Sequence, residues 1–565
     1  MRGSSWAGRL LAAAVLGVLA LPASAMGHAE RPSYYPNFDP VTKQFLAPFG
    51  RVPTDRSNGA RLVVCKSDSE QRINKLPDPA MRAYNTSLWS LCRFRHIQQA
   101  VDAAKTGERI LIMPGVYREQ PSTHVPNPDT RCADMYVADA RGGGQVPAYE
   151  YHYNCPQSQN LIAITGDDPD DADRRCDQKC NLLIEGTARR RDVLISGARD
   201  KLNVIRADRA DGIYLRNFTI EFSDFNNIYA LETNGFRFED IESRYSREYG
   251  FLSFASDQGL YNRVTAYRSG DSGIYPGSGP EGHCKRYGIE IKNSDSHHNN
   301  LGYSGTAGNG VWAHDNKFHH NGTGLVTDSF ASGHPGMPQD CAKWENNEIY
   351  SNNYDLFNDE QDAYCKNTPW PKRKPNRVCP TFQNPVGTGI LIAGGNANIA
   401  RHNRIYDNWR QGVALFFVPA ELRGDDSTGQ SENNDTDQAD TSHDNKFANN
   451  VMGVNRKGQR DPNGVDFWWD EQGSGNCWQG NVGPGGAAPT NNFPLQESTG
   501  VTDCPGSPVP LSPNPAKSGF LVPCATWDPS TEGEPPPADM TDPPGCRMGP
   551  LGQETSWFEV PPEPQ

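Results

Sequence analysis

The sequence predicts an all-β protein built as a parallel β-helix, a solenoid in which each turn of the chain adds one strand to each of several sheets. The first observation is a repeat of 22 to 23 residues: Phe218, Ile241 and Val264 are spaced 23 residues apart, and Ser296 precedes Phe318 by 22. The second is a period of two in the apolar residues of each unit, with no helical pattern between units. Repeats of this length made of strands and turns alone are typical of a β-solenoid.

Strands are expected where apolar residues alternate, as in "GIEIK" at 288–292 and "GVWAH" at 310–314. Alternate residues of a strand point to opposite sides, so the Ile, Val and Ala of these runs should face the core. A second pattern reads Asn, any residue, Ile or Phe, any two residues, Asn, and it occurs at 316–321, 347–352, 403–408 and 445–450. We expect each Asn to bond to backbone groups at a turn and to its own copy in the next rung.

The repeat also sets the expected ends of the coil. The segment "HIQQAVDAAK" at 96–105 has its apolar residues on one helical face and leads into a strand at 109–117. Such a helix should cap the N-terminal end, where strand edges would otherwise be open. The expected organisation is a signal peptide over 1–25, an irregular disulfide-tied extension over 26–95, a β-helix with inserted loops over 96–480 and a proline-rich tail over 481–565.

The N-terminus has the features of a secretory signal peptide. Arg2 and Arg9 precede an apolar run, and "ASA" at 23–25 supplies the small residues of a cleavage site. No later run approaches the ~20 apolar residues that a membrane-spanning helix needs. We therefore expect a secreted, extracellular protein without stable membrane insertion.

Cysteine usage fits export. The chain has 14 cysteines, and disulfides are the expected state in an oxidising compartment. Cys365 and Cys379 bracket a polar insert and are expected to close it. Cys176 and Cys180, in "CDQKC", leave a disulfide and a metal knuckle both open.

The charge balance narrows the expected partners. A net charge of −14 argues against a polyanion-binding surface spread over the whole molecule, and no nucleic-acid-binding motif occurs. We expect a monomer that binds no nucleic acid.

Two stretches resemble a known group of proteins. "IQQAVDAAKTGERILIMPGVYRE" is similar to the opening of secreted right-handed parallel β-helix proteins of the pectin-lyase-like superfamily, and "GILIAGGNANIARHNRIYDN" is similar to their short repeats. The resemblance implies a single-stranded, right-handed coil and, for many members, action on polysaccharides. The signatures of pectin methylesterases, polygalacturonases and alginate epimerases are missing, so no catalytic residue of the superfamily is carried over.

One candidate site follows from the register of the repeat. A 22-residue step aligns Glu290 with Trp312 and Lys292 with His314, and a 31-residue step continues these columns to Lys343 and Glu345. Such columns point outward, where a tryptophan could stack on a sugar and Glu290, His314 and Glu345 could move protons. The alternative is a solvated sheet face of weak ion pairs.

A second candidate site lies at another turn, beside the longest loops. Tyr275 and Asp328 should point outward there, and His334 lies in the loop that follows Asp328. Arg268 and Asp271 precede the same turn and could supply a cation and a proton-transfer group. Loops carried on a rigid coil are a common place for function, and His283 and Asp340 could converge there as well.

Histidines are concentrated in the same region. The pairs His297–His298 and His319–His320 occur one rung apart. Four imidazoles in adjacent rungs could bind zinc or copper. Neighbouring residues of a strand face opposite ways, however, so each column supplies only two ligands, and corner histidines bonded to backbone are the alternative. We assign no metal ligands.

The predicted function is binding, and cleavage or modification, of an extracellular polysaccharide by a lyase- or hydrolase-type reaction. Sugar contacts are expected from Trp312, Tyr275, Tyr303 and Tyr229. Substrate binding is further expected from Arg268 and Lys343; no cofactor is required, although calcium could neutralise a uronic acid. The sequence leaves open whether the protein is an enzyme: a non-catalytic carbohydrate-binding or cell-surface structural protein and a NosD-like metal-handling protein are the alternatives.

Overall fold

The computed structural model describes residues 31–491 and 559–565 apart from short gaps. The gaps are residues 37, 40, 41, 43, 46–49, 58, 141–143, 171–173, 281, 331, 332, 382, 383, 419, 424–429 and 431–440. The expected signal peptide and most of the expected proline-rich tail, with Cys504, Cys524 and Cys546, lie outside the described residues. Among the described residues, no helix is long and apolar enough to span a bilayer.

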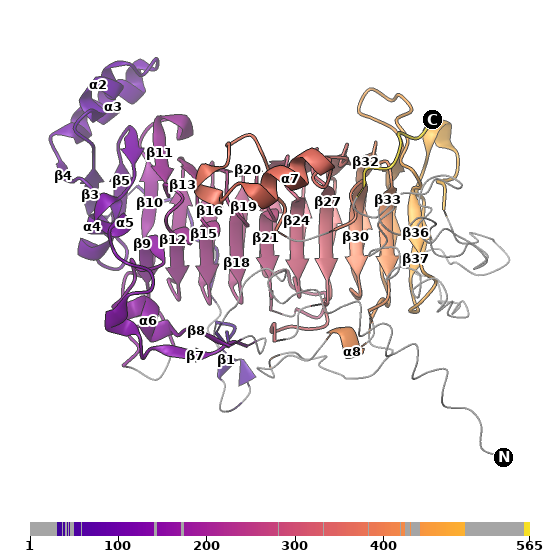
Figure 1. Cartoon of the computed structure of the whole chain (residues 1–565), viewed down its shortest axis with the longest axis horizontal. Coiled ribbons are helices and arrows are strands. Elements are labelled where there is room, and N and C mark those ends of the chain that lie inside the picture. The colour runs from indigo at the N-terminus through magenta and orange to yellow at the C-terminus, as the bar shows by residue number, and fades with distance from the viewer. Residues whose placement is uncertain are drawn as a thin grey trace.

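Three long parallel sheets form the body of the protein (Figure 1). Each rung contributes one strand to each sheet in turn, as β13, β14 and β15 do before β16 returns beside β13. The predicted parallel β-helix is confirmed. The first sheet holds β3 (Arg61–Val64), β4 (Cys92–Phe94), β5 (Arg109–Ile112), β10 (Leu183–Gly186), β13 (Ile213–Arg216), β16 (Asn234–Glu239), β19 (Asp257–Asn262), β22 (Ile289–Lys292), β25 (Val311–His314), β28 (Lys343–Glu345), β31 (Ile399–Arg401), β34 (Lys446–Ala448) and β37 (Cys477–Gln479).

The other two sheets have ten strands each. The second holds β6 (Gly115–Tyr117), β11 (Val193–Ser196), β14 (Thr219–Glu221), β17 (Glu242–Arg244), β20 (Thr265–Tyr267), β23 (Asp295–His297), β26 (Lys317–His319), β29 (Glu348–Tyr350), β32 (Arg404–Tyr406) and β35 (Val451–Met452). The third holds β9 (Asn160–Thr165), β12 (Asn203–Asp208), β15 (Asn226–Leu231), β18 (Phe251–Phe254), β21 (Ser272–Gly277), β24 (Leu301–Thr306), β27 (Thr323–Asp328), β30 (Thr388–Ala393), β33 (Gln411–Phe416) and β36 (Phe467–Trp469).

Helices and short hairpins decorate the coil. The hairpins are β1 (Phe38–Asp39) with β2 (Gln44–Phe45) and β7 (Tyr136–Ala138) with β8 (Gln145–Pro147). The α-helices are α2 (Ser69–Asn74), α3 (Pro79–Trp89), α4 (Ile97–Ala103), α5 (Gln120–Thr123), α6 (Tyr149–Asn154), α7 (Asp359–Asn367) and α8 (Ala420–Arg423). Short 3-10 turns lie at Thr130–Cys132, Arg190–Asp192, Trp370–Lys372 and Pro484–Gly486.

The core lies inside the coil and is made of alternate residues of every strand. Ile228, Phe251 and Ile274 stack in register across β15, β18 and β21, and each is fully buried. The residues expected to point inward from 288–292 and 310–314 are likewise buried. Rungs ~4.8 Å apart bring these side chains into direct contact, which gives a continuous apolar column.

Asparagine ladders stabilise the turns between the sheets. At the turn between the first and second sheets, Asn347 donates its amide Nδ2–H to Asn403 Oδ1 at 3.1 Å, and its backbone N–H to the same oxygen at 2.9 Å. The ladder at this turn comprises Asn316, Asn347, Asn403, Asn450 and Asn481. The ladder between the second and third sheets comprises Asn299, Asn321, Asn352, Asn408 and Asn463. The expected bonding of each Asn to its own copy is confirmed for 316–321, 347–352 and 403–408. It is wrong in register for 445–450, because Asn450 continues the first ladder after Asn403, and Asn445 lies in a third ladder between Asn398 and Asn476.

The helix expected at 96–105 is α4, and its side chains Ile97, Ala100 and Val101 are buried in the core. The carboxylate of Glu119 accepts the N–H groups of Ile97 and Gln98, each at 3.0 Å, which satisfies the start of the helix. The first sheet continues past this helix into the stretch that was expected to be irregular: β3 pairs with β5 and β4 with β3. Long polar segments separate these strands, so the sequence shows no regular repeat in this region.

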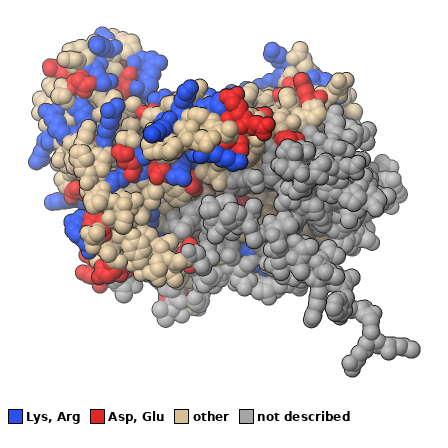
Figure 2. Space-filling model, in the orientation of Figure 1, with Lys and Arg blue, Asp and Glu red and all other residues tan. Residues whose placement is uncertain are grey.

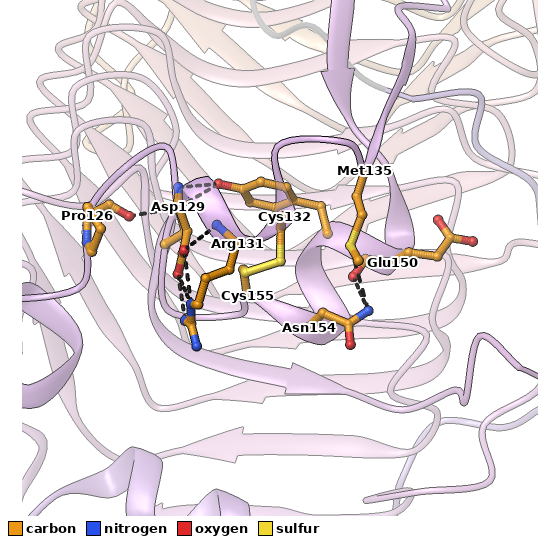
Figure 3. Close-up of a disulfide and its surroundings, with 10 residues drawn as sticks. Pro126, Asp129, Arg131, Cys132, Met135, Glu150, Asn154 and Cys155 are labelled. Carbon is orange, nitrogen blue, oxygen red and sulfur yellow. Dashed lines mark hydrogen bonds and ion pairs between the residues drawn. A yellow bond between two sulfur atoms is a disulfide. The ribbon is translucent and has the colours of Figure 1, made fainter.

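Five disulfides lie among the described residues. Cys365 pairs with Cys379 as expected, and Cys176 pairs with Cys180, so the metal knuckle is excluded there. A further one, Cys132–Cys155, joins α6 to the turn before β7 (Figure 3). The remaining two are Cys65–Cys92 and Cys284–Cys341.

The ladder predicts a specific stability effect. Replacing Asn403 by Ala leaves the backbone and amide N–H groups of Asn347 and the carbonyl of Trp344 without their partner. Each buried group of this kind costs about 1–3 kcal/mol, so we expect a loss of about 2–4 kcal/mol in chemical denaturation. Asn367→Ala, at an exposed site in α7, should change stability by less than about 0.5 kcal/mol. Equal losses in both variants would contradict a structural role of the ladder.

Candidate functional site

The outward side chains of the third sheet form a surface that we call the third face. Two long insertions flank it (Figure 1). Beside the start of the strands lies the insertion over 353–387, which carries α7 and the Cys365–Cys379 disulfide. Beside the end of the strands lie the loops 278–288 and 329–342, which the Cys284–Cys341 disulfide joins. Cross-linked loops on both sides give the third face rigid borders.

The α7 insertion is held against the coil by polar contacts. The N–H of Thr381 donates to the carbonyl of Gly270 at 2.9 Å. The guanidinium of Arg268 donates to the carbonyl of Asn376 at 2.7 Å and to the hydroxyl of Tyr354 at 3.2 Å. Arg268 thus positions the insertion, which differs from the substrate contact expected of it. In the space-filling view, basic and acidic side chains lie side by side along this upper edge of the molecule (Figure 2).

Asp271 lies at the base of this insertion, immediately before β21. It is 3% exposed and accepts the hydroxyl of Ser272 at 2.7 Å. Burial raises the pKa of Asp271 to about 7; hydrogen bonds from Ser272 and Tyr249 oppose the shift, and the charge of Asp328 adds to it. A carboxyl with this pKa can donate or accept a proton near neutral pH.

Asp328 lies at the opposite border, at the end of β27. Its carboxylate accepts the Thr306 hydroxyl at 2.8 Å and the N–H of Phe330 at 3.2 Å. Burial raises the pKa of Asp328, and these two hydrogen bonds offset only part of the shift. The third face therefore carries a buried carboxyl, Asp271, and a half-buried one, Asp328, each at the base of a flanking insertion.

Aromatic residues lie beside these carboxyls. Tyr275 points outward as expected, is 3% exposed, and packs on Tyr249 with ring centroids 4.8 Å apart. His334 is also buried, with its ring 5.0 Å from that of Phe254. Tyr249 was not among the expected site residues, although the 23-residue repeat aligns it with Ser272 and could have identified it.

One expected sugar contact is wrong. Tyr303 aligns with Ile274 and Leu325, points into the core and is fully buried, with its ring 6.2 Å from that of Phe318. The strand period places this tyrosine on the inner side of β24. Tyr229 does point outward, but it too is fully buried, because other residues cover it.

The first face, made of outward side chains of the first sheet, has the expected register. Glu290 pairs with Trp312, and Trp312 with Lys343, while His314 lies between Lys292 and Glu345. The carboxylates of Glu290 and Glu345, however, both form ion pairs with neighbouring side chains. Lys292 and His314 contact Glu290 at 2.8 and 3.0 Å.

Glu345 is bound more fully still. It receives Lys343 at 2.7 Å, Arg401 at 2.6 Å and the indole N–H of Trp312 at 3.2 Å. Burial raises the pKa of both glutamates, but their hydrogen bonds to cationic partners outweigh it and leave each pKa lowered. The Trp312 ring stacks on His314 at 4.2 Å and has the Lys343 ammonium 4.8 Å from its centroid. On this face, ion pairs therefore favour the charged form of both carboxylates.

The second face carries an aromatic column that the sequence reasoning missed. Tyr267, His297, His319, Tyr350 and Tyr406 align on consecutive strands, and their rings stack with centroids 4.8 to 5.2 Å apart. The register of the Asn frame gives this alignment directly. Aromatic stacking on a regular rung spacing stabilises the second sheet.

The histidine pairs lie in and beside this column. The Nδ1 atoms of His297 and His298 are 2.8 Å apart, and those of His319 and His320 are 2.7 Å apart, so in each pair one ring donates to the other. Burial, more than the neighbouring cations, lowers the pKa of His297 and of His298 to about 4. In the described part of the chain, no group of three or more His, Cys, Asp or Glu side chains is arranged to hold a metal ion.

A buried ionic network at the N-terminal end of the third face was also missed. Arg206 and Asp208 of β12 pair at 2.9 Å, and Arg209 binds Glu232 at 2.7 Å. Arg31, far away in sequence, inserts between Asp208 and Glu232 at 2.9 Å from each. The outward positions of β12 could have been read from the repeat, but Arg31 lies in the stretch without repeats.

No family model matches the chain, and no curated protein matches its sequence. Among solved structures, the chain is similar to the A-module of mannuronan C-5 epimerase AlgE4 of Azotobacter vinelandii, with 10% identity and a TM-score of 0.36 over 68% of this chain and 90% of that one. It is also similar to pectate lyase Pel9A, with 13% identity and a TM-score of 0.35 over 79% and 84% of the two chains. A match to the Dettilon tailspike protein has 11% identity and a TM-score of 0.33 over 61% and 66%. No activity is transferred from these proteins to this chain.

The histidine pairs predict an acid-sensitive stability. His297 and His298 titrate at about 4 in the folded protein and near their ordinary value of 6.5 when unfolded. The unfolded chain therefore binds more protons between these values, and stability should be complete above pH 6.5 and fall as the pH drops toward 4. The variant His297→Tyr/His298→Ser, which copies the residues Tyr350 and Ser351 of another rung, should flatten this dependence in thermal melts.

His124→Ser is the matched control, because His124 is exposed on the turn after α5. It should melt with the same pH dependence as the parent protein. A double variant that keeps the full acid sensitivity would show that other groups cause it.

Proposed function

We propose that this protein binds an extracellular polysaccharide along the third face and modifies it by acid–base chemistry. The observation that carries the proposal is the placement of two carboxyls with raised pKa values, the buried Asp271 and the half-buried Asp328, at the bases of the two disulfide-linked insertions that border this face. A straight stack of strands offers a polymer the same backbone spacing at every rung.

The two carboxyls suit different roles. Asp271, with a pKa of about 7, is the proposed proton donor. Asp328 is the second proton-transfer group, held by Thr306 so that its carboxylate faces a fixed direction. Tyr275, between the two borders, is the proposed sugar contact, and the choice between hydrolysis and elimination is left to product analysis.

The first face supports the proposal less well. Glu290 and Glu345 are each bound by cationic side chains that lower their pKa values, so neither is suited to hold a proton for a leaving group. A proton donor for glycosidic oxygen needs the opposite, a carboxyl whose pKa is raised.

A non-catalytic carbohydrate-binding protein is the second candidate. It is favoured by one observation: Asp271 is only 3% exposed, so the third face presents little of the proposed proton donor to a polymer. Binding without any change in the polymer's reducing ends or unsaturation would identify this function.

The proposal predicts the effect of Asp271→Asn. Product formation from a panel of acidic and neutral polysaccharides should fall at least about 100-fold, because a positioned proton-transfer group contributes about 100- to 10,000-fold. The parent activity should decline as the pH rises through about 7, where Asp271 loses its proton. The variant should lack this limb of the pH profile while binding the polymer with unchanged affinity.

Glu290→Gln serves as the control and as a test of the competing face. It should leave product formation unchanged. Loss of activity in Glu290→Gln, with full activity in Asp271→Asn, would show that the reaction takes place on the first face.

A further inference from the structure

Residues 31–36 and Phe38, which we call the N-terminal strap, lie across the third face. Arg31 contacts Asp208 at the end of β12 and Glu232 just after β15, and the backbone N–H of Tyr34 donates to Glu232 at 2.8 Å. Four residues further on from Arg31, the hydroxyl of Tyr35 donates to the carbonyl of Gly279, just after β21. The strap therefore crosses successive rungs in the direction of the coil axis.

The strap covers the aromatic part of the third face. Tyr35 and Phe38 are 2% and 8% exposed and belong to one apolar cluster with the outward side chains beneath them. Those side chains are Tyr229, Leu231, Leu252, Phe254 and Tyr275, with Tyr249 beside them. The same cluster thus contains the proposed sugar contact Tyr275 and the hydrogen-bond partner of Asp271.

The strap is held by non-covalent contacts. The first cysteine of the chain is Cys65, so no disulfide ties the strap to the coil. Gln430 adds two hydrogen bonds, accepting the N–H of Tyr35 at 2.6 Å and donating to the carbonyl of Ser33 at 2.8 Å. All these bonds can break without a covalent step.

The carboxylates beneath the strap have other cationic partners, so the strap can dissociate without leaving them unpaired. If Arg31 leaves, Asp208 keeps its pair with Arg206 and Glu232 keeps its pair with Arg209. No carboxylate is then left buried without a cation, which would be the most costly outcome. The guanidinium of Arg31 itself is 4% exposed, and its Nε and Nη1 find no acceptor among the described residues, so this anchor is imperfect.

We infer that the N-terminal strap is an intramolecular occupant of the polysaccharide-binding surface, which a polymer must displace to reach Tyr275 and Asp271. The inference rests on the proposed function. An extended segment that runs along the axis, with aromatic rings laid on an aromatic floor, occupies the path that an extended polymer with flat sugar rings would take. Displacement exposes Tyr229, Leu252 and Tyr275 together, and these provide the apolar contacts that a sugar face needs.

The test uses the full-length exported protein with the strap released. Arg31→Ala/Tyr35→Ala removes the ionic anchor and the Gly279 contact, and Tyr84→Ala/Arg93→Ala removes the same residue types at exposed sites away from the third face. Binding of polygalacturonate, alginate and xylan is measured by calorimetry for both variants and the parent. We expect the released-strap variant to bind at least one of these polymers 10-fold or more tightly than the parent, and the control variant to match the parent.

A second measurement keeps the test decisive if the double variant folds poorly. Arg31→Gln alone, which retains the shape of the anchor, should bind at least 3-fold more tightly than the parent. A synthetic peptide of residues 31–39 should compete with the polymer for the released-strap variant, while a scrambled peptide should not.

The outcomes separate the two proposals. Equal affinity of the parent and both strap variants for a polymer would overturn the strap inference and leave the proposed function standing. Binding by none of the folded proteins would overturn both. Tighter binding by the strap variants together with full product formation by Asp271→Asn would uphold the strap and refute the catalytic assignment.

Discussion

The structure depends on one constraint: each rung must lie in register with the next. The asparagine ladders enforce it, because one side-chain oxygen accepts both the backbone and the amide N–H of the preceding Asn. Inserted residues are tolerated only as excursions that return to the same ladder. The step from Asn352 to Asn408 shows this, since it spans the whole α7 insertion and still closes at 3.0 Å. Loops can therefore grow beside the third face while the face itself stays straight.

That constraint explains what could be predicted from the sequence. The register of neighbouring rungs follows from the spacing of Asn, Ile and Phe along the chain. The predicted alignment of residues on the first face is therefore confirmed at every position. The inward position of Tyr303 was available from the same period and was overlooked in favour of its chemistry. The position of the strap could not be predicted from the sequence. Arg31 and its partner Asp208 are 177 residues apart, and no repeat covers residues 31–38.

The contrast between the faces shows why site chemistry is harder to predict than register. Both candidate sites offer carboxylates on outward positions of parallel strands. On the first face, Glu345 has Lys343 and Arg401 within reach and its pKa is lowered. On the third face, Asp271 has only hydroxyl donors and a covering layer, and its pKa is raised to about 7. The difference arises from which residues cover each face, and those residues are distant in sequence.

The cover is also what connects stability to function in this protein. The floor of the third face is aromatic and apolar, and a surface of that kind left open to water would be costly to maintain. The strap buries it and adds ion pairs at one end. A ligand that removes the strap must therefore replace both its rings and its hydrogen bonds, which favours a long polymer with flat apolar faces and many hydroxyl groups over a small molecule. The strap would then set a threshold for ligand length, because a ligand shorter than the strap recovers only part of what it displaces.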